Sequence, residues 1–441
     1  MNKPTFTACI FAIASLTTSF ASFAADIPLA SVKSDVSTLA SDDMQGRASF
    51  TPGAEKAANY IAKRFKEIGL TPLKDSFKQT FDVYVRQVTS SSITLNNKAV
   101  PMEDIAVISN SPELQWQKSD FTHVSNIDAK SDLRSSLSKL NQQGGNHLVL
   151  VDPSHKKLFK RYQAYFAHPK TKLDDTDGGS LVLVLTPVKQ PEHFTVSVKT
   201  KIETKKLTNI VGVLPGKAKD DESVIYSAHY DHLGVKKHPK KGEKDIIFNG
   251  ADDDASGVTG VINLAQYFKT QANNQRRLVF VAFAAEELGG FGSQFFSKSL
   301  DADTIVAMIN MEMIGKPSKF GKGKVWMTGF ERSDLATIMN NALKHEHKEI
   351  YADPYPKQRL FYRSDNATLA RLGVPAHSFS STQIDKDPHY HNVSDELKTL
   401  DLRSMQKVIE TIADASSPLV SGKATPTRID PSKVNQSGKI F

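Results

Sequence analysis

The sequence predicts an α/β protein with a mostly parallel central sheet flanked by helices and a smaller β-rich domain inserted into it. Two observations carry this prediction. After Leu207, apolar strand-like runs alternate with amphipathic helical patterns, which is typical of a parallel sheet covered on both faces. Between about Thr80 and Lys205 the runs are short, β-like and separated by polar connections, which indicates a separate small core.

The parallel sheet is predicted from four buried-strand patterns and the helical patterns between them. The strands are expected at residues 223–228, 278–285, 304–311 and 374–380, and the helices at 256–268, 333–345 and 402–415. A further helix is expected over residues 54–68, where Ala57, Ile61, Phe65 and Ile68 share one face and Gly69 follows as a stop signal.

These patterns divide the chain into four parts. The main α/β domain is predicted to comprise residues 25–80 and 206–418, and the inserted domain residues 81–205. Residues 419–441 are rich in Ser, Pro, Gly and Lys and are predicted to form a flexible C-terminal tail.

Residues 1–24 are predicted to be a secretory signal peptide. Lys3 precedes an apolar run that ends in small residues before Asp26, and cleavage is expected after Ala24. The alternative is a retained membrane anchor, which is disfavoured because Thr and Ser interrupt the run and a cleavage site follows. We therefore expect a secreted or periplasmic protein without a stable membrane anchor. The single cysteine, Cys9, lies in this segment, so the mature protein would contain no disulfide.

The overall charge gives little support for a nucleic-acid partner. The chain has 56 Lys and Arg against 48 Asp and Glu, a formal net charge of +8, but the basic residues do not form a dense block interleaved with aromatic residues. The lysines of residues 236–244 are interpreted as a solvated loop. Nucleic-acid binding is therefore not predicted, and no pattern in the sequence sets the oligomeric state.

Three consecutive carboxylates, Asp252, Asp253 and Asp254, precede a helix start in NGADDDASGV. Helix capping explains Asp254, because a carboxylate at a helix N-terminus accepts backbone hydrogen bonds and interacts with the macrodipole. Three like charges in succession repel each other and need further compensation. A divalent cation bound by one carboxylate, with backbone donors on its neighbours, would supply it.

Other metal-ligating residue types occur where predicted strands end. His229 ends the first strand in SAHYDHLG, and Asp231 is placed to hydrogen-bond its imidazole. Glu286 and Glu287 follow the second strand, so that one can bind metal while the other faces the substrate; a solvated glutamate pair is the alternative. Glu312 is the only charge in the apolar third strand.

A final candidate ligand lies in DPHYHNVSDEL, where His389 and His391 flank Tyr390, and His391 is preferred. Imidazole and carboxylate ligands together suit zinc. Two zinc ions that share a bridging carboxylate form a co-catalytic pair about 3.5–4 Å apart. The pattern therefore predicts a metal centre at the carboxyl edge of the sheet.

At this point the sequence resembles the secreted dizinc aminopeptidase family, whose relatives include glutamate carboxypeptidase, glutaminyl cyclase and the transferrin receptor ectodomain. The motifs are LASDDMQGR, AANYIAKRFKEIGL, TNIVGVLPG, SAHYDHLG, GADDDASGV, AAEELGG and YHNVSDEL. The resemblance implies two Zn²⁺ ions, one bound by His229 and Glu312 and the other by Glu287 and His391, with Asp253 bridging both. It also implies that Glu286 is the general base and that Asp231 orients His229.

The resemblance raises three further expectations. The family commonly has Asp at the position of Glu312, so a retained ligand with an altered metal preference is expected there. Tyr362 and the SFSST stretch near Phe379 resemble substrate-side loops. The inserted region from about Thr80 to Lys205 occupies the place of a protease-associated domain, or forms a lid that restricts substrate size.

The function implied is a secreted zinc-dependent aminopeptidase that hydrolyses N-terminal residues from peptide substrates, using water activated by two zinc ions and a Glu general base. Within the same fold, a carboxypeptidase, a dipeptidase or a glutaminyl cyclase is the alternative. A metal-free binding protein is an alternative of another class, but it predicts lost ligands, whereas the full ligand set is present here.

Overall fold

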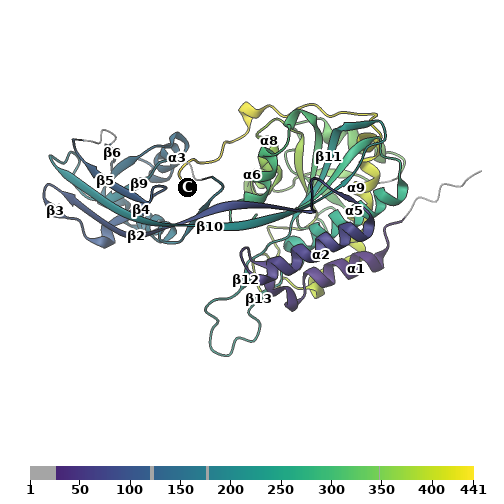
Figure 1. Ribbon diagram of the computed structural model, residues 1–441, viewed down its shortest axis with the longest axis horizontal. Helices are drawn as coiled ribbons and strands as arrows, with labels where there is room; N and C mark the ends of the chain where they lie inside the picture. The colour runs from purple at the N-terminus through teal and green to yellow at the C-terminus, as the bar shows by residue number, and fades with distance from the viewer. Residues whose placement is uncertain (1–25, 120–123, 175–177, 347) are drawn as a thin grey trace, which may run out of the picture.

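The computed structural model describes residues 26–119, 124–174, 178–346 and 348–441 (Figure 1). The predicted signal peptide, its cleavage site and Cys9 lie outside these residues. Within the described ranges, no helix has both the length and the apolar character needed to cross a membrane.

Four parallel strands form the middle of the central sheet, as predicted. They are β11 (Lys219–His229), β14 (Arg276–Phe283), β15 (Ile305–Met311) and β18 (Ala376–Ser380). β14 and β15 each pair in parallel with β11, and β18 pairs in parallel with β15. Their side chains are buried almost throughout, because each face of the sheet packs against its own apolar cluster. The carboxyl ends of these strands therefore meet at one edge.

The sheet continues beyond this parallel core. β10 (Phe194–Leu214) pairs antiparallel with β14 on one side, while β16 (Val325–Met327) pairs antiparallel with β18 on the other and leads to β17 (Ile350–Ala352). The order across the described part of the sheet is β17-β16-β18-β15-β11-β14-β10-β2-β3. The predicted mostly parallel sheet flanked by helices is thus confirmed.

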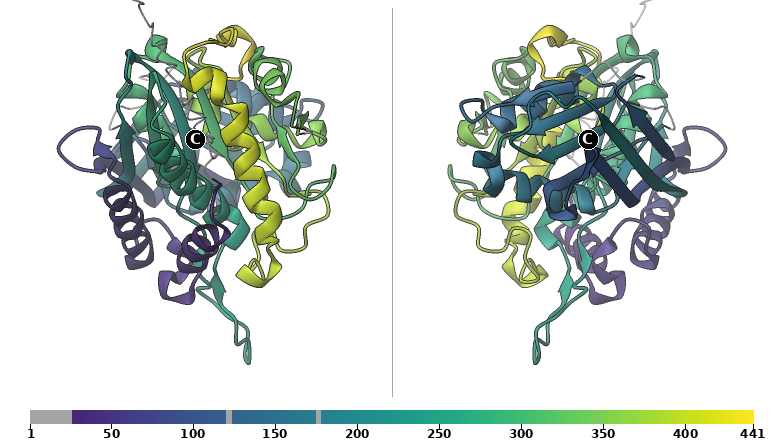
Figure 2. Two further views of the ribbon diagram at one scale, coloured as in Figure 1. Left: turned by 90° about the vertical axis from the view of Figure 1, so that its right-hand side faces the viewer. Right: turned by 90° about the vertical axis from the view of Figure 1, so that its left-hand side faces the viewer.

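Helices cover both faces of this sheet. One face packs against α1 (Leu29–Leu39), α2 (Pro52–Ile68), α5 (Gly257–Gln271), α7 (Leu335–Leu343), α9 (Leu402–Ala415) and α10 (Ser417–Val420). Figure 2 shows α9 on the outside of this face, where it contacts α5. The other face packs against α6 (Phe291–Lys298) and α8 (Asn366–Ala370). The helix expected over residues 54–68 is confirmed, and Gly69 ends it with a left-handed φ of 80°.

A long two-stranded ribbon joins the central sheet to a second, smaller sheet (Figure 1). The ribbon consists of β2 (Lys78–Leu95) and β10, which pair antiparallel from Lys78 and Ile210 to Leu95 and Phe194. The second sheet has the order β4 (Ile105–Ile108), β9 (Leu181–Leu185), β7 (His147–Val151) and β6 (Val124–Ile127). The domain boundaries near residues 80 and 205 stay a prediction, because β2 and β10 run unbroken through both positions.

The smaller sheet also carries two helices that the sequence did not predict, α3 (Leu133–Gln143) and α4 (Lys156–Ala167). Only Leu133, Leu137 and Asn141 of α3 are buried, and only Phe159 and Phe166 of α4. With the partly buried Leu140 and Tyr162, these residues recur at helical spacing, so a helical periodicity was present in the sequence beside the β-like runs. β6, β7 and β9 are parallel, so the inserted region is a small α/β unit rather than a purely β one.

The C-terminal segment crosses from the main sheet to the smaller one and packs against it (Figure 1). Ile440 is fully buried in the cluster under α3 and α4, and the Phe441 ring packs edge-on to Phe166. The Asn141 side chain accepts the backbone N–H groups of Ile440 (2.8 Å) and Phe441 (2.9 Å). Two apolar residues at the end of a polar segment thus dock into a core, while the flexibility expected of residues 419–441 stays a prediction.

Replacing Ile440 by Ala tests this docking. The variant should lower the free energy of unfolding of the smaller unit by about 2–4 kcal/mol, because it removes a fully buried aliphatic side chain. Chemical denaturation followed by hydrogen exchange on α3 and α4 measures the effect. Ser437→Ala, at an exposed position of the same segment, is the matched control. Equal stability of the two variants would contradict the docking and would indicate that this segment is a loosely held tail.

Candidate metal centre

The structure brings the five predicted metal ligands together at the carboxyl edge of the sheet. His229 ends β11, Glu287 follows β14, Glu312 follows β15 and His391 lies in the loop after β18. Asp253 lies in the irregular turn, residues 251–256, that leads into α5. Segments distant in sequence thus converge because the ends of neighbouring parallel strands share one edge.

The Asp253 carboxylate lies between the two histidines. Its Oδ1 is 3.2 Å from His229 Nε2, and its Oδ2 is 3.2 Å from His391 Nε2. Glu312 Oε1 lies 3.6 Å from His229 Nε2, and Glu287 Oε1 lies 3.4 Å from His391 Nε2. The arrangement has two halves, each with one imidazole and one glutamate, that share one aspartate.

These separations fit tetrahedral zinc. Ligand atoms about 2.0–2.1 Å from a tetrahedral ion lie about 3.3 Å from each other. Burial would lower the pKa of His391, but the Asp253 and Glu287 carboxylates raise it to about 10. Burial would likewise lower the pKa of His229, which nearby carboxylates, Glu312 foremost, raise well above its ordinary value. The carboxylates therefore create a site that favours positive charge, and the donor set suits zinc.

The other two carboxylates of the acidic run are held by backbone donors. Asp254 Oδ1 accepts the N–H groups of Met313 and Gly257, both at 3.0 Å. Asp252 Oδ1 accepts the N–H of Gly315 at 2.8 Å, and its Oδ2 accepts the Thr382 hydroxyl at 2.6 Å. Burial raises the pKa of Asp252 to about 7 and that of Asp254 well above its ordinary value. Both residues support the turn that presents Asp253.

Asp231 supports the centre in a different way from the one the sequence suggested. Its backbone carbonyl lies 3.0 Å from His229 Nδ1, whereas its carboxylate Oδ1 is 3.8 Å away. A hydrogen bond from Nδ1–H to this carbonyl leaves Nε2 of His229 free to bind a metal. The Asp231 carboxylate instead accepts the backbone N–H of Glu286 at 3.0 Å and the Ser49 hydroxyl at 3.2 Å. Asp231 thus orients the candidate ligand His229 through its carbonyl and positions the candidate base Glu286 through its carboxylate.

Glu286 directly precedes the ligand Glu287 and adjoins the centre. Among the described residues, no group forms a hydrogen bond with its side-chain carboxyl, so that carboxyl is free to meet a water molecule. Burial raises the pKa of Glu286 well above its ordinary value, and the Glu312 charge adds to the shift. A carboxylate with a raised pKa is a better proton acceptor near neutral pH.

The backbone is strained at this edge. Ala285, Met313 and His391 adopt left-handed φ angles of 59°, 53° and 53°, which residues other than Gly, Asn and Asp rarely adopt. They are the residue before Glu286, the residue after Glu312 and a candidate ligand itself. Strain of this kind is concentrated at functional sites, where surrounding contacts stabilise it.

The structure also reveals supporting residues that the sequence did not identify. His232 Nδ1 lies 2.8 Å from Glu287 Oε1 and 3.9 Å from Asp253 Oδ2. With Asp253 and Glu287 it forms one of the two groups able to hold an ion among the residues that the structure describes, the other being His229, Asp254 and Glu312. Because 2.8 Å is a hydrogen-bond distance, shorter than a tetrahedral edge, we assign His232 as the partner that orients Glu287. The sequence signal that could have identified His232 as a supporting residue is its place in the HYDHLG motif, two residues before Gly234 and close to the candidate ligand His229.

Glu312, the departure from the family pattern, is held by Ser364. The Ser364 hydroxyl donates to Glu312 Oε2 at 2.6 Å and accepts from Asn310 Nδ2 at 2.8 Å. Oε1 is left facing His229.

Of the two histidines that flank Tyr390, His389 lies against the Ser394 hydroxyl at 2.9 Å, and His391 is the one at the centre.

A pocket adjoins Glu312, and its walls include part of the expected substrate-side stretch. The lining residues are Glu312, Met313, Trp326, Thr328, Leu360, Arg363, Ser364, Ser378, Ser380, Thr382, Ile384 and Tyr390. Tyr362 does not line it; its ring packs against Phe361, and its hydroxyl accepts from Arg332 at 3.2 Å.

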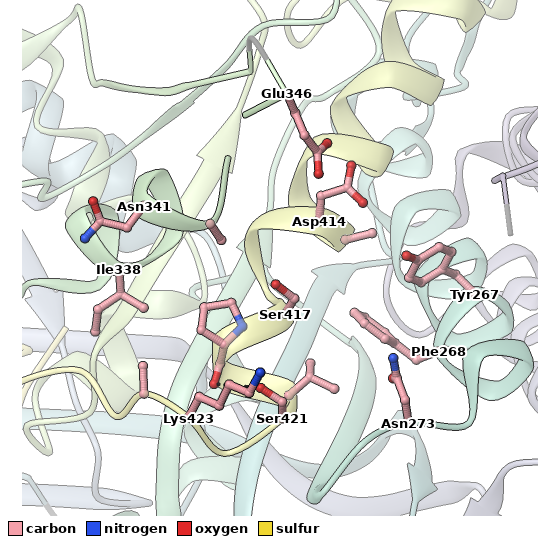
Figure 3. Close-up of a pocket in the computed structure, with 15 residues that line it drawn as sticks. Tyr267, Phe268, Asn273, Ile338, Asn341, Glu346, Asp414, Ser417, Ser421 and Lys423 are labelled. Carbon is pink, nitrogen blue, oxygen red and sulfur yellow. Dashed lines mark hydrogen bonds between the residues drawn. The ribbon is translucent and has the colours of Figure 1, made fainter. Parts of the chain in front are cut away.

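A cavity of about 660 Å³ lies elsewhere, between α5, α7, α9 and α10 (Figure 3). It is close to the amino end of β14, where Gln275 donates its N–H to the Val420 carbonyl. None of the five candidate ligands lines it. Its size alone therefore does not make it the catalytic site.

Comparisons with known proteins agree with this fold. Residues 209–416 match the model of Peptidase family M28. The chain is 31% identical over 185 residues to a probable zinc metalloprotease of Pyricularia oryzae, covering 42% of this chain and 35% of that protein. It is 25% identical over 126 residues to aminopeptidase NAALADL1 of Mus musculus, covering 27% of this chain and 15% of that protein. The chain thus spans about a third or less of the length of these curated relatives.

A solved structure extends the likeness to nearly the whole fold. BSAP, a zinc aminopeptidase from Bacillus subtilis, superposes with a TM-score of 0.55 at 15% identity, over 94% of this chain and 100% of that one. At that identity the likeness establishes the fold alone. The resemblance stated from the motifs is confirmed over residues 209–416, which are similar to Peptidase family M28.

Replacing His391 by Ala tests the ligand assignment. The variant should bind about one zinc ion per chain and the unmodified protein about two, because one half of the centre loses its imidazole. Metal analysis after gel filtration measures this ratio. His389→Ala is the matched control and should keep both ions; the reverse result would make His389 the ligand.

Proposed function

We propose that this protein is an exported dizinc aminopeptidase that hydrolyses the N-terminal residue from peptides. One observation carries the proposal: Asp253 lies between His229 and His391, and Glu286 adjoins the ligand Glu287. A closed structural zinc site would have no such neighbouring base. The proposed ligands are His229 and Glu312 for one ion, Glu287 and His391 for the other, and Asp253 for both.

The protein's own residues have separate roles in the proposed hydrolysis. The five ligand residues would hold zinc, which would supply Lewis-acid chemistry toward water and toward the peptide carbonyl. Glu286 takes a proton from the attacking water and returns it to the leaving amine. Asp231 fixes the position of Glu286 through its backbone N–H and orients His229 through its carbonyl. His232 and Ser364 hold the two ligand glutamates.

The remaining parts of the proposal concern location and domain roles. Residues 1–24 would direct export and then be removed, which agrees with a secreted or periplasmic enzyme. The inserted unit joins the ribbon whose β10 strand lies beside the carboxyl end of β14, where Ile210 pairs with Ala282. The ribbon thus leaves the sheet at the edge where the candidate ligands lie, and the role proposed for the inserted unit is that of a lid or a protease-associated domain.

Replacing Glu286 by Gln tests its proposed role as the base. The variant should keep two zinc ions and its fold but lose about 10²–10⁴-fold in kcat, because the amide cannot accept the proton. Glu331→Gln, at an exposed glutamate, is the matched control and should keep full turnover. Wild-type turnover in Glu286→Gln would remove Glu286 as the base.

A substrate panel tests the exopeptidase class. Purified mature protein should release the chromophore from aminoacyl anilides, and both chelation and N-acetylation of the substrate should abolish release, because the proposed reaction needs zinc and a free amine. Activity confined to blocked or carboxyl-terminal substrates would instead indicate a carboxypeptidase. Cyclisation of N-terminal glutamine without hydrolysis would indicate a glutaminyl cyclase.

A further inference from the structure

The Lys316 side chain lies among three carboxylates beside the segments that carry the candidate metal ligands. Lys316 Nζ is 2.7 Å from Asp387 Oδ2, 3.3 Å from Asp395 Oδ1 and 3.6 Å from Asp252 Oδ2. The lysine side chain is 11% exposed, and all three carboxylates are 4% exposed or less. An ammonium therefore occupies the middle of an acidic cluster that adjoins the metal ligands.

Asp395 links this ammonium to the bridging ligand. Its second oxygen, Oδ2, accepts the backbone N–H groups of Asp252 at 3.0 Å and Asp253 at 3.1 Å. Its backbone carbonyl accepts the N–H of Ala251 at 3.1 Å. The position of the Asp253 backbone thus depends on the position of the Asp395 carboxylate, which Lys316 contacts.

Asp387 links the same ammonium to the loop that carries His391. Its Oδ1 accepts the backbone N–H of His389 at 3.1 Å, two residues before the ligand. Asp387 and Asp395 thus bracket His391 in sequence, and Lys316 contacts both carboxylates. The Lys316 ammonium connects the segments that carry Asp253, Glu312 and His391, since Lys316 itself follows Glu312 by four residues.

Electrostatics favours a charged lysine here. Burial would lower the pKa of Lys316, but Asp252, Asp395 and Asp387 together raise it above its ordinary value. Without the ammonium, three closely spaced carboxylates would repel each other and move apart. The loop with His391 is the most exposed of the connected segments, and the His391 side chain itself is 38% exposed.

The other half of the centre does not depend on this cluster to the same degree. His229 is held by the end of β11 and by the Asp231 carbonyl. Glu312 donates its backbone N–H to the Phe379 carbonyl at 3.0 Å, and Ser364 holds its carboxylate. Loss of the ammonium should therefore affect the two halves unequally.

We propose that Lys316 is a positioning residue of the metal centre: it holds the loop of His391 against the Asp253 turn and thereby sets the affinity of the ion on the Glu287–His391 side. The inference rests on the proposed dizinc function and deepens it. Lys316 acts through Asp387 and Asp395 and does not touch the metal or the substrate. Residues that orient ligands in this way change metal affinity about 10–100-fold when they are replaced.

The experiment compares Lys316→Met, Lys316→Arg and Lys322→Met in the metal-free mature protein. Lys322 is the matched control, because it pairs with Asp401 at 2.8 Å but its side chain is 76% exposed. Zinc is titrated in competition with a chromophoric chelator to obtain both affinities. Thermal unfolding of the metal-free proteins and the visible spectrum of their Co²⁺ forms are recorded in parallel.

Lys316→Met should bind the first ion as the wild type does and the second about 10–100-fold more weakly, with an altered Co²⁺ spectrum for the second ion only. Lys316→Arg should recover most of that affinity, and Lys322→Met should match the wild type. If Lys316→Met does not fold, Asp387→Asn replaces it and should weaken the same ion by a smaller factor.

Two results would contradict the inference. Reduced thermal stability with both zinc affinities unchanged would mean that Lys316 only neutralises charge in the fold. Equal weakening of both ions would mean that it does not act through the His391 loop. A wild-type protein that binds no zinc would instead remove the proposed function itself, so the two failures can be distinguished.

Discussion

The crowding of carboxylates around Asp253 is the constraint on which this edge of the structure depends. Asp252, Asp253 and Asp254 are consecutive and buried, so each charge requires its own compensation. Asp254 receives backbone N–H groups, Asp252 receives N–H and hydroxyl donors with Lys316 nearby, and Asp253 faces two imidazoles. A pair of dications beside Asp253 would complete this balance.

Like Lys316, Arg47 is a buried cation, and it connects the segment before Asp252 to residues near the N-terminal helix α1. Arg47 is fully buried and donates to the backbone carbonyls of Leu39, Tyr230, Asn249 and Gly250. Burial lowers its pKa to about 10 even though Asp253 and other carboxylates raise it, so the guanidinium remains charged at neutral pH. The LASDDMQGR motif thus has a structural explanation, because Arg47 fixes the backbone on both sides of the centre.

Periodicity and strand ends predicted the four parallel strands of the main sheet, the helices α2, α5, α7 and α9, and the edge at which the candidate ligands meet. Those predictions succeed because burial on both faces leaves long apolar runs, and because functional groups follow parallel strands. The docking of Ile440 was not predictable in the same way, because its burial comes from contacts that join distant parts of the chain. The helices α3 and α4 were missed although apolar residues recur at helical spacing in both.

In the candidate site, too, some features could be predicted from the sequence and others depend on the three-dimensional structure. Residue types and positions indicated His229, Glu312, His391 and the Glu286–Glu287 pair. The choice of Glu287 within that pair and of Asp253 within three aspartates came from the family resemblance. Its place between two imidazoles is a feature of three-dimensional geometry. The Asp231 carbonyl in contact with His229, and the contacts of His232, Ser364 and Lys316, depend on side-chain directions that sequence spacing does not contain.

The central claim is that Asp253 bridges two metal ions. Anomalous diffraction at the zinc absorption edge, from crystals of the mature protein grown with zinc, tests this claim most directly. The account predicts two peaks, one on each side of the Asp253 carboxylate, beside His229 Nε2 and His391 Nε2 respectively. A single peak, or zinc bound away from Asp253, would contradict it.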